Sequence, residues 1–158
     1  MRRSAWLRGV IAGLTGGVAW FLAIMAIFGP AQIVLADPEL QSLKMLAAFT
    51  EEPLPRAAES PWILIVGVLV IGMMWGLVYV WLTQAGGLWS DRSWGGRGLR
   101  FGAVGWVLMV PWFVFYLPWN VLREPALLVA LEMACWAGVL LAVGMATAGA
   151  ERWLRKGA

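Results

Sequence analysis

Four long apolar stretches fill most of this chain. They cover residues 9–28, 62–83, 101–117 and 126–147, about 17 to 22 residues each. At about 1.5 Å per residue, a helix of this length crosses a hydrocarbon core of about 30 Å, and the third stretch is just long enough. None of the first three contains a charged residue, and the fourth contains only Glu132. We therefore predict one all-α membrane domain over residues 1–158, with four transmembrane helices in a bundle.

Composition supports this class and excludes several others. Hydrophobic residues make up 61% of the 158 residues and charged residues 13%, more apolar surface than a soluble domain of this size can bury. The single cysteine, Cys135, excludes an intrachain disulfide. The absence of histidine excludes bis-histidine haem, the usual zinc and copper sites and nucleophile–histidine catalysis. We predict no cofactor, no metal site and no enzymatic activity; a lipid-acting enzyme with Glu124 or Glu132 as its base is the most distant alternative.

The net charge of +3 comes from basic residues at the edges of the apolar stretches. They lie before the first stretch, between the second and third, and after the fourth: Arg2, Arg3, Arg8, Arg92, Arg97, Arg100, Arg152, Arg155 and Lys156. The connection over residues 29–61 is acidic instead. By the positive-inside rule, we predict that both termini are cytoplasmic and that this connection faces outward. This distribution favours a bacterial inner (cytoplasmic) membrane and no nucleic-acid partner.

The acidic connection contains a helix-start pattern. Asp37-Pro38-Glu39 offers an N-cap, a first-turn proline and an acidic residue near a helix N-terminus. It predicts a short amphipathic helix over residues 38–49 that lies on the outward-facing surface of the membrane. An alternative is a secretory signal cleaved after Ala36, but the apolar run before it is longer than a signal core.

The first and third stretches begin with matching residues at identical spacing. Arg8-Gly9, Gly13, Gly16 and Val18 correspond to Arg97-Gly98, Gly102, Gly105 and Val107. Both copies run from inside to outside, which is compatible with a parallel duplication of a helical hairpin. Chance similarity between glycine-rich apolar helices is the alternative.

Small residues recur at four-residue spacing along the predicted spans. Such stripes allow helix backbones to approach closely in lipid, where there is no hydrophobic driving force between helices. The residues expected to form close helix contacts are Gly9, Gly13, Gly17, Gly72, Gly76, Ala130, Ala134, Gly138 and Ala142.

Glu132 points about 200° away from Ala130 on the fourth helix and lies about 10 Å below its outer end. A charge at such a depth is costly in lipid, so we expect it to face protein or a wet cavity. The polar residues expected near it are Tyr116, Asn120, Arg123 and Glu124. Glu132 is then either a proton or cation site or a protonated, hydrogen-bonded structural residue. Intramembrane tryptophans such as Trp112 and Trp136 form either a lipophilic-ligand slot or ordinary aromatic packing.

The segment from Pro118 to Pro125, followed by Glu132, resembles small four-span bacterial membrane proteins, a resemblance that implies no activity. The sequence favours a non-enzymatic helix-bundle protein that self-associates or serves as an accessory subunit of a membrane complex. The alternative is a small transporter or channel that uses Glu132 as its proton- or cation-coupled site.

Overall fold

The computed structural model describes residues 3–42, 47, 51, 60–86 and 93–156, and within them it contains helices and no strand. The helices are α1 (Arg3–Leu35), α4 (Pro61–Gln84), α5 (Trp94–Val110), the π-helix η2 (Pro111–Leu122) and α6 (Ala126–Lys156). Since η2 continues α5 directly, the described chain has four helical segments long and apolar enough to cross a membrane. The predictions of an all-α chain and of four membrane-length helices are confirmed.

Most helices extend beyond the apolar stretches that predicted them. α1 has 33 residues and α6 has 31, about 50 Å and 46 Å at the usual helical rise. Both exceed a hydrocarbon core of about 30 Å, so their charged ends lie beyond it. The backbone hydrogen bonds of a helix are satisfied in water as well as in lipid, so the helix need not stop where the apolar sequence stops.

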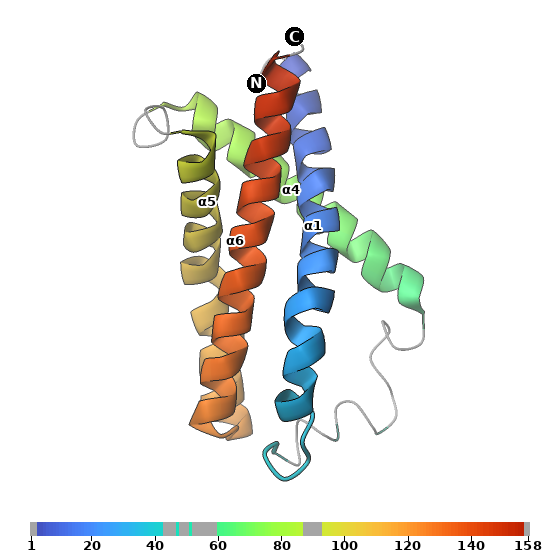
Figure 1. Cartoon of the computed structure of the whole chain (residues 1–158), viewed down its shortest axis with the longest axis vertical. Helices are drawn as coiled ribbons and strands as arrows, with labels where there is room; N and C mark the ends of the chain where they lie inside the picture. The colour runs from blue at the N-terminus through green and yellow to red at the C-terminus, as the bar shows by residue number, and fades with distance from the viewer. Residues whose placement is uncertain (1–2, 43–46, 48–50, 52–59, 87–92, 157–158) are drawn as a thin grey trace.

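Three of the segments run side by side, and the fourth crosses them. Figure 1 shows α6 between α1 and α5, while α4 passes obliquely behind α1. The C-terminal half of α4 packs near the end of the molecule that holds both chain termini, where Trp75 and Tyr79 meet Phe101 edge-on. Its N-terminal half diverges, which leaves Trp62 71% exposed.

Glycines bring the backbones of α1 and α4 together. A methyl group on Gly13 would lie 2.7 Å from the Cα atom of Met73, and one on Gly72 would lie 2.8 Å from the Cα atom of Gly17. Gly76 faces the backbone of Gly9 and Gly13 equally closely. Five glycines of the predicted stripes therefore lie along one helix–helix seam, where any side chain would force the helices apart.

A second glycine seam joins α5 to α6. A methyl group on Gly98 would lie 2.8 Å from the carbonyl oxygen of Gly144, and one on Gly102 would lie 2.8 Å from the Cα atom of Leu141. In turn, a methyl group on Gly144 would lie 2.8 Å from the backbone nitrogen of Gly102. The glycines of α5 that match those of α1 in the sequence thus make the same kind of contact with the helix that follows them.

The alanine stripe of α6 does not form the seam that was expected at its outer end. Ala130 and Ala134 are exposed and Ala142 is half-buried, while a methyl group on Gly138 would lie 2.8 Å from the side chain of Ile27 on α1. The buried face of α6 instead carries Val139, Val143 and Thr147, among others. Because this face turns toward α1 and α5, Ala130 and Ala134 stay exposed in the part of the chain that the structure describes.

The helix predicted over residues 38–49 differs at its start. Residues 38–42 form turns and a bend rather than a helix, and Asp37 Oδ1 accepts a hydrogen bond from the backbone N–H of Glu39 at 3.0 Å. Asp37 therefore caps a turn, as Asp commonly does. Most of the remaining predicted helix, residues 43–46 and 48–49, lies outside the described residues.

Candidate functional site

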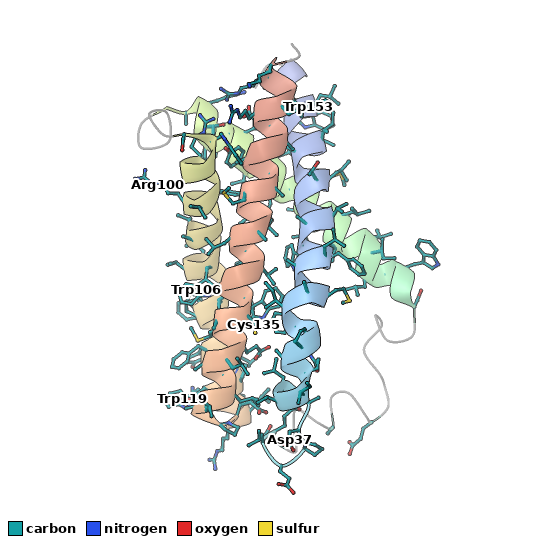
Figure 2. The ribbon with its side chains drawn as sticks, viewed as in Figure 1. Asp37, Arg100, Trp106, Trp119, Cys135 and Trp153 are labelled. Atoms are coloured by element: carbon teal, nitrogen blue, oxygen red, sulfur yellow. The ribbon has the colours of Figure 1, made fainter. Side chains whose placement is uncertain are left out.

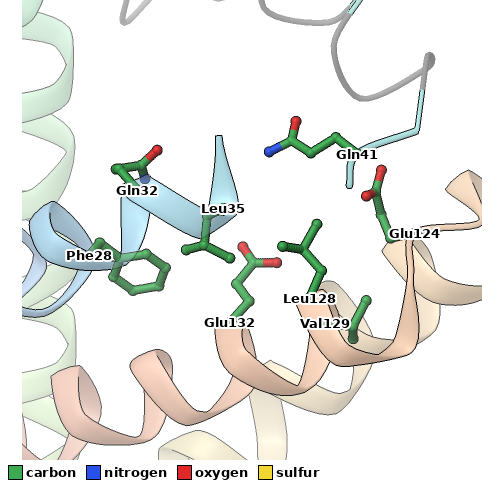
Figure 3. A pocket seen from close by; sticks show the side chains of 8 residues that line it. All are labelled: Phe28, Gln32, Leu35, Gln41, Glu124, Leu128, Val129 and Glu132. Atoms are coloured by element: carbon green, nitrogen blue, oxygen red, sulfur yellow. The ribbon is translucent and has the colours of Figure 1, made fainter. Parts of the chain in front are cut away.

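A pocket with two acidic side chains lies at the end of the molecule opposite the chain termini. Its volume is about 150 Å³, comparable to a cavity that holds a benzene-sized molecule. Figure 3 shows the side chains that line it, which come from α1, the turn after α1 and the start of α6. They are Phe28, Gln32, Leu35, Gln41, Glu124, Leu128, Val129 and Glu132.

Glu124 reaches the pocket because of an irregular helix end. Pro111 and Pro118 lack the N–H that an α-helix needs, and the chain between them winds as the π-helix η2. Arg123 then adopts a left-handed conformation with φ 60°, and the N–H of Glu124 donates to the carbonyl of Pro118 at 3.0 Å. The backbone turns at this point, so that the Glu124 side chain faces the segment after α1 (Figure 3).

Ser42 holds the Glu124 carboxylate in place. The Ser42 hydroxyl donates to Glu124 Oε1 at 2.6 Å, and the Ser42 backbone N–H donates to the same oxygen at 3.1 Å. Glu124 is only 5% exposed. A buried carboxylate needs such donors, and these two tie the turn after α1 to the start of α6.

Glu132 lies deeper, two turns into α6, and is half-buried. The indole of Trp136 lies beside it, one turn further along the same helix. That indole is itself held edge-on by Trp20, at 6.2 Å between ring centroids, and by Phe28, at 5.2 Å. The carboxyl group therefore sits between an aromatic cluster and the open volume of the pocket.

The chemistry of the pocket favours a positively charged guest. Among the described residues, its lining includes two carboxylates and the amides of Gln32 and Gln41, and no lysine or arginine. Two carboxylates in one cavity repel each other when both are ionised, so a proton or a cation between them lowers the energy. In the part of the chain that the structure describes, no three His, Cys, Asp or Glu side chains cluster, so a bound metal ion would need the amide oxygens as well.

The structure brings together two of the five predicted site residues. Glu124 and Glu132 share the pocket, whereas Tyr116, Asn120 and Arg123 are exposed and do not line it. Because η2 is a π-helix, its side chains follow a different angular spacing from an α-helix, which turns Tyr116 and Asn120 away. Gln32 and Gln41 were missed, although a glutamine within the apolar end of the first helix is a detectable signal.

The intramembrane tryptophans divide between packing and exposure. Trp20, Trp75 and Trp136 take part in edge-on aromatic contacts, and Trp106 donates its indole N–H to the carbonyl of Met133 at 3.0 Å. Trp112 is exposed. Helix packing therefore accounts for most of these residues without a lipophilic ligand.

The outer surface of the helices is apolar, as in a membrane protein. Large apolar side chains point outward over the length of the molecule, among them Leu22, Leu108 and Leu127. Figure 2 places Trp119 and Asp37 at one end and Trp153 at the other, with Cys135 between them. Together with the four membrane-length helices, this pattern defines a multi-pass membrane protein. Comparisons with protein-family models, curated proteins and solved structures find no match.

Proposed function

We propose that this protein is a small transporter or channel subunit that binds a proton or a cation in the acidic pocket, with Glu132 as the principal ligand. The observation that carries the proposal is the meeting of Glu132 and Glu124 in one cavity, whose described lining contains no basic side chain. An ionisable group at membrane depth is costly, and such groups commonly mark ion pathways. Glu132 binds the charge, Glu124 is the second carboxylate, and the two glutamines supply neutral oxygen ligands.

The charge distribution supports an orientation for this site. Arg100 lies toward the end that holds the termini, and Asp37, which follows α1, lies at the pocket end (Figure 2). The positive-inside rule then gives cytoplasmic termini and an outward-facing pocket, in a bacterial inner membrane. A cation would enter from the outside.

Flux into liposomes tests this function. We expect purified wild-type protein to carry protons, Na⁺ or a small alkylammonium ion across the membrane, and Glu132→Gln to abolish that flux. Glu39→Gln removes an exposed acidic side chain outside the pocket and should leave flux unchanged. Absence of flux from the wild-type protein with all three probes, or equal flux with Glu132→Gln, would contradict the proposal.

A second candidate function is that of a non-enzymatic oligomer or accessory subunit. The exposed face of α6 that carries Ala130 and Ala134 favours it, since small residues allow another helix to approach closely. We expect Ala130→Leu and Ala134→Leu to leave the monomer folded and to disrupt association in mild detergent, measured by light scattering after gel filtration. The transport function and this assembly are compatible, and Glu132→Gln should not affect the latter.

We also infer that the chain is a parallel duplication of a helical hairpin. Gly9 and Gly13 contact Gly76 as Gly98 and Gly102 contact Gly144. The cross-contacts between the hairpins correspond in part. Gly105 faces Trp75, the residue before Gly76, and Gly16 faces Thr147 and, at a greater distance, Val143, the residue before Gly144.

A further inference from the structure

The acidic pocket has hydrocarbon walls as well as carboxylates. Half of the described side chains that line it carry no polar group, and they are Phe28, Leu35, Leu128 and Val129. Figure 3 shows Leu35 and Leu128 on either side of the Glu132 carboxyl group. A guest that binds at Glu132 therefore meets apolar surface next to a negative charge.

The volume of the pocket is larger than a bare ion needs. It is about 150 Å³, and an apolar cavity of about this volume holds benzene. A water molecule takes up about 30 Å³, so a hydrated metal ion would fill the pocket with several waters. Those waters would lie against the four apolar side chains, which cannot hydrogen-bond to them. The pocket is therefore better matched to a guest that brings its own apolar part.

Aromatic rings lie next to Glu132. Phe28 lines the pocket, and its ring is edge-on to that of Trp136, with 5.2 Å between the ring centroids. Trp136 follows Glu132 by one turn of α6. Aromatic rings offer apolar surface to alkyl groups, and their faces attract cations. A carboxyl group in such surroundings favours an organic cation over an inorganic one.

The polar side chains of the pocket offer the acceptors that an ammonium group needs. Such a group has three N–H donors and no acceptor. The carboxylate of Glu132 and the amide oxygens of Gln32 and Gln41 can accept from them. Ser42 donates to Glu124 Oε1 at 2.6 and 3.1 Å, and its N–H lies 3.3 Å from Oε2, so Oε2 keeps room for a further donor.

We propose that the cation of the acidic pocket is a small organic ammonium ion, with its N–H donors on Glu132 and its alkyl part against Phe28, Leu35 and Leu128. This rests on the proposed function, because it names the chemical class of the cation that the pocket binds. The charge–charge hydrogen bond orients the ammonium group, and burial of the alkyl part distinguishes this ion from Na⁺. Butylammonium has slightly fewer heavy atoms than benzene, so it fits the volume.

A series of alkyl lengths tests the proposal on the purified full chain. Isothermal titration calorimetry in mild detergent at neutral pH compares methyl-, ethyl-, propyl- and butylammonium chloride with NaCl at constant ionic strength. We expect the affinity to rise about fourfold with each added methylene group, because each one buries apolar surface, and Na⁺ to bind more weakly than butylammonium. Butan-1-ol has the same alkyl part without the charge and should bind about tenfold more weakly than butylammonium. Glu132→Gln should abolish binding of the whole series.

Two neighbouring leucines give a matched pair of variants. Leu128 lines the pocket, whereas Leu127 is 80% exposed and is not among the described lining residues. Leu128→Phe takes up part of the pocket volume, so we expect methylammonium still to bind and the gain toward butylammonium to disappear. Leu127→Phe should keep the wild-type series. If Leu128→Phe fails to fold, the wild-type series and Glu132→Gln still decide the proposal.

The outcomes separate the organic cation from the proposed transport. Na⁺ binding that Glu132→Gln abolishes, with no dependence on alkyl length in the ammonium series, would overturn the organic cation and leave a cation site at Glu132. Butylammonium binding that Glu132→Gln abolishes, without flux in liposomes, would support the organic cation and contradict transport. Absence of butylammonium binding, or equal binding by wild type and Glu132→Gln, would show that the proposal is wrong.

Discussion

At the scale of single residues, the chain places three carboxyl groups inside a largely apolar molecule, and each has a different kind of partner. Glu124 accepts from a serine and Glu151 from an arginine, whereas Glu132 lies beside the indole of Trp136. Glu124 and Glu132 both face the open volume of the pocket, but Glu124 is buried and held by the hydroxyl and the backbone N–H of Ser42, whereas Glu132 is half-buried. This is why Glu132, rather than the more deeply buried Glu151, is the better candidate for an exchangeable proton or cation.

Glu151 should matter for stability. Glu151→Ala leaves Arg155 and the neighbouring positive charges without their buried carboxylate, and a hydrogen bond to a charged group contributes about 1.5–3 kcal/mol. Arg155 is 41% exposed, so water screens part of this loss, and we expect a destabilisation of about 1–2 kcal/mol. Thermal unfolding in detergent measures it.

Glu39→Ala is the matched control for this change, because Glu39 is exposed in the turn after α1. An unfolding midpoint for Glu151→Ala that equals those of Glu39→Ala and wild type would show that the buried ion pair does not contribute to stability.

At the scale of helices, the glycine seams determine which segments pair. α4 meets α1 through Gly72 and Gly76, and α6 meets α5 through Gly144, so each helical hairpin is closed by backbone contact. The N-terminal part of α4, which precedes Val68, is largely exposed and diverges from the other helices (Figure 1).

The seam predicts opposite effects for two glycines. A methyl group in Gly13→Ala would meet the backbone of Met73 at 2.7 Å, and relieving such overpacking costs about 1–3 kcal/mol. Gly67 on α4 has open space where a methyl group would lie, so Gly67→Ala should be neutral or gain about 0.5–1 kcal/mol from helix propensity. Unfolding in a denaturing detergent compares the two, and equal midpoints would argue against backbone contact at Gly13.

At the scale of the whole molecule, the central expectation is that the termini and the acidic pocket lie on opposite sides of a membrane. Cys135 is buried and is first replaced by alanine. In that background we expect Glu39→Cys to react with a membrane-impermeant maleimide added to intact cells and Lys156→Cys to react only after the membrane is opened. Labelling of both positions in intact cells would contradict the proposed threading.

Sequence alone was enough to predict the helices and the two acidic residues of the pocket, Glu124 and Glu132. Long uncharged stretches have few folded forms other than membrane helices, and an isolated Glu132 within one of them stands out. The orientation of Tyr116 and Asn120 was not predictable in the same way, because the π-helical winding between Pro111 and Pro118 changes which side each residue faces.

Two further features required the tertiary structure. The partner of Gly102 could be any small residue of α6, and the four-residue spacing favoured Ala130 and Ala134, whereas Gly144 lies outside that register. The burial of Glu151 was hidden by its position in a basic tail, where a solvated charge is the usual outcome. Only the packing of α6 between α1 and α5 places it inside.

The reactivity of Glu132 in native membranes tests the central claim most directly. Dicyclohexylcarbodiimide modifies protonated carboxyl groups in apolar surroundings, and peptide mass spectrometry locates the adduct. We predict an adduct on Glu132 that Na⁺, Ca²⁺ or a small alkylammonium ion suppresses when added beforehand, with no such protection at Glu39. A Glu132 that remains unmodified, or that is modified equally with and without all three cations, would contradict the account of an acidic pocket that binds a cation.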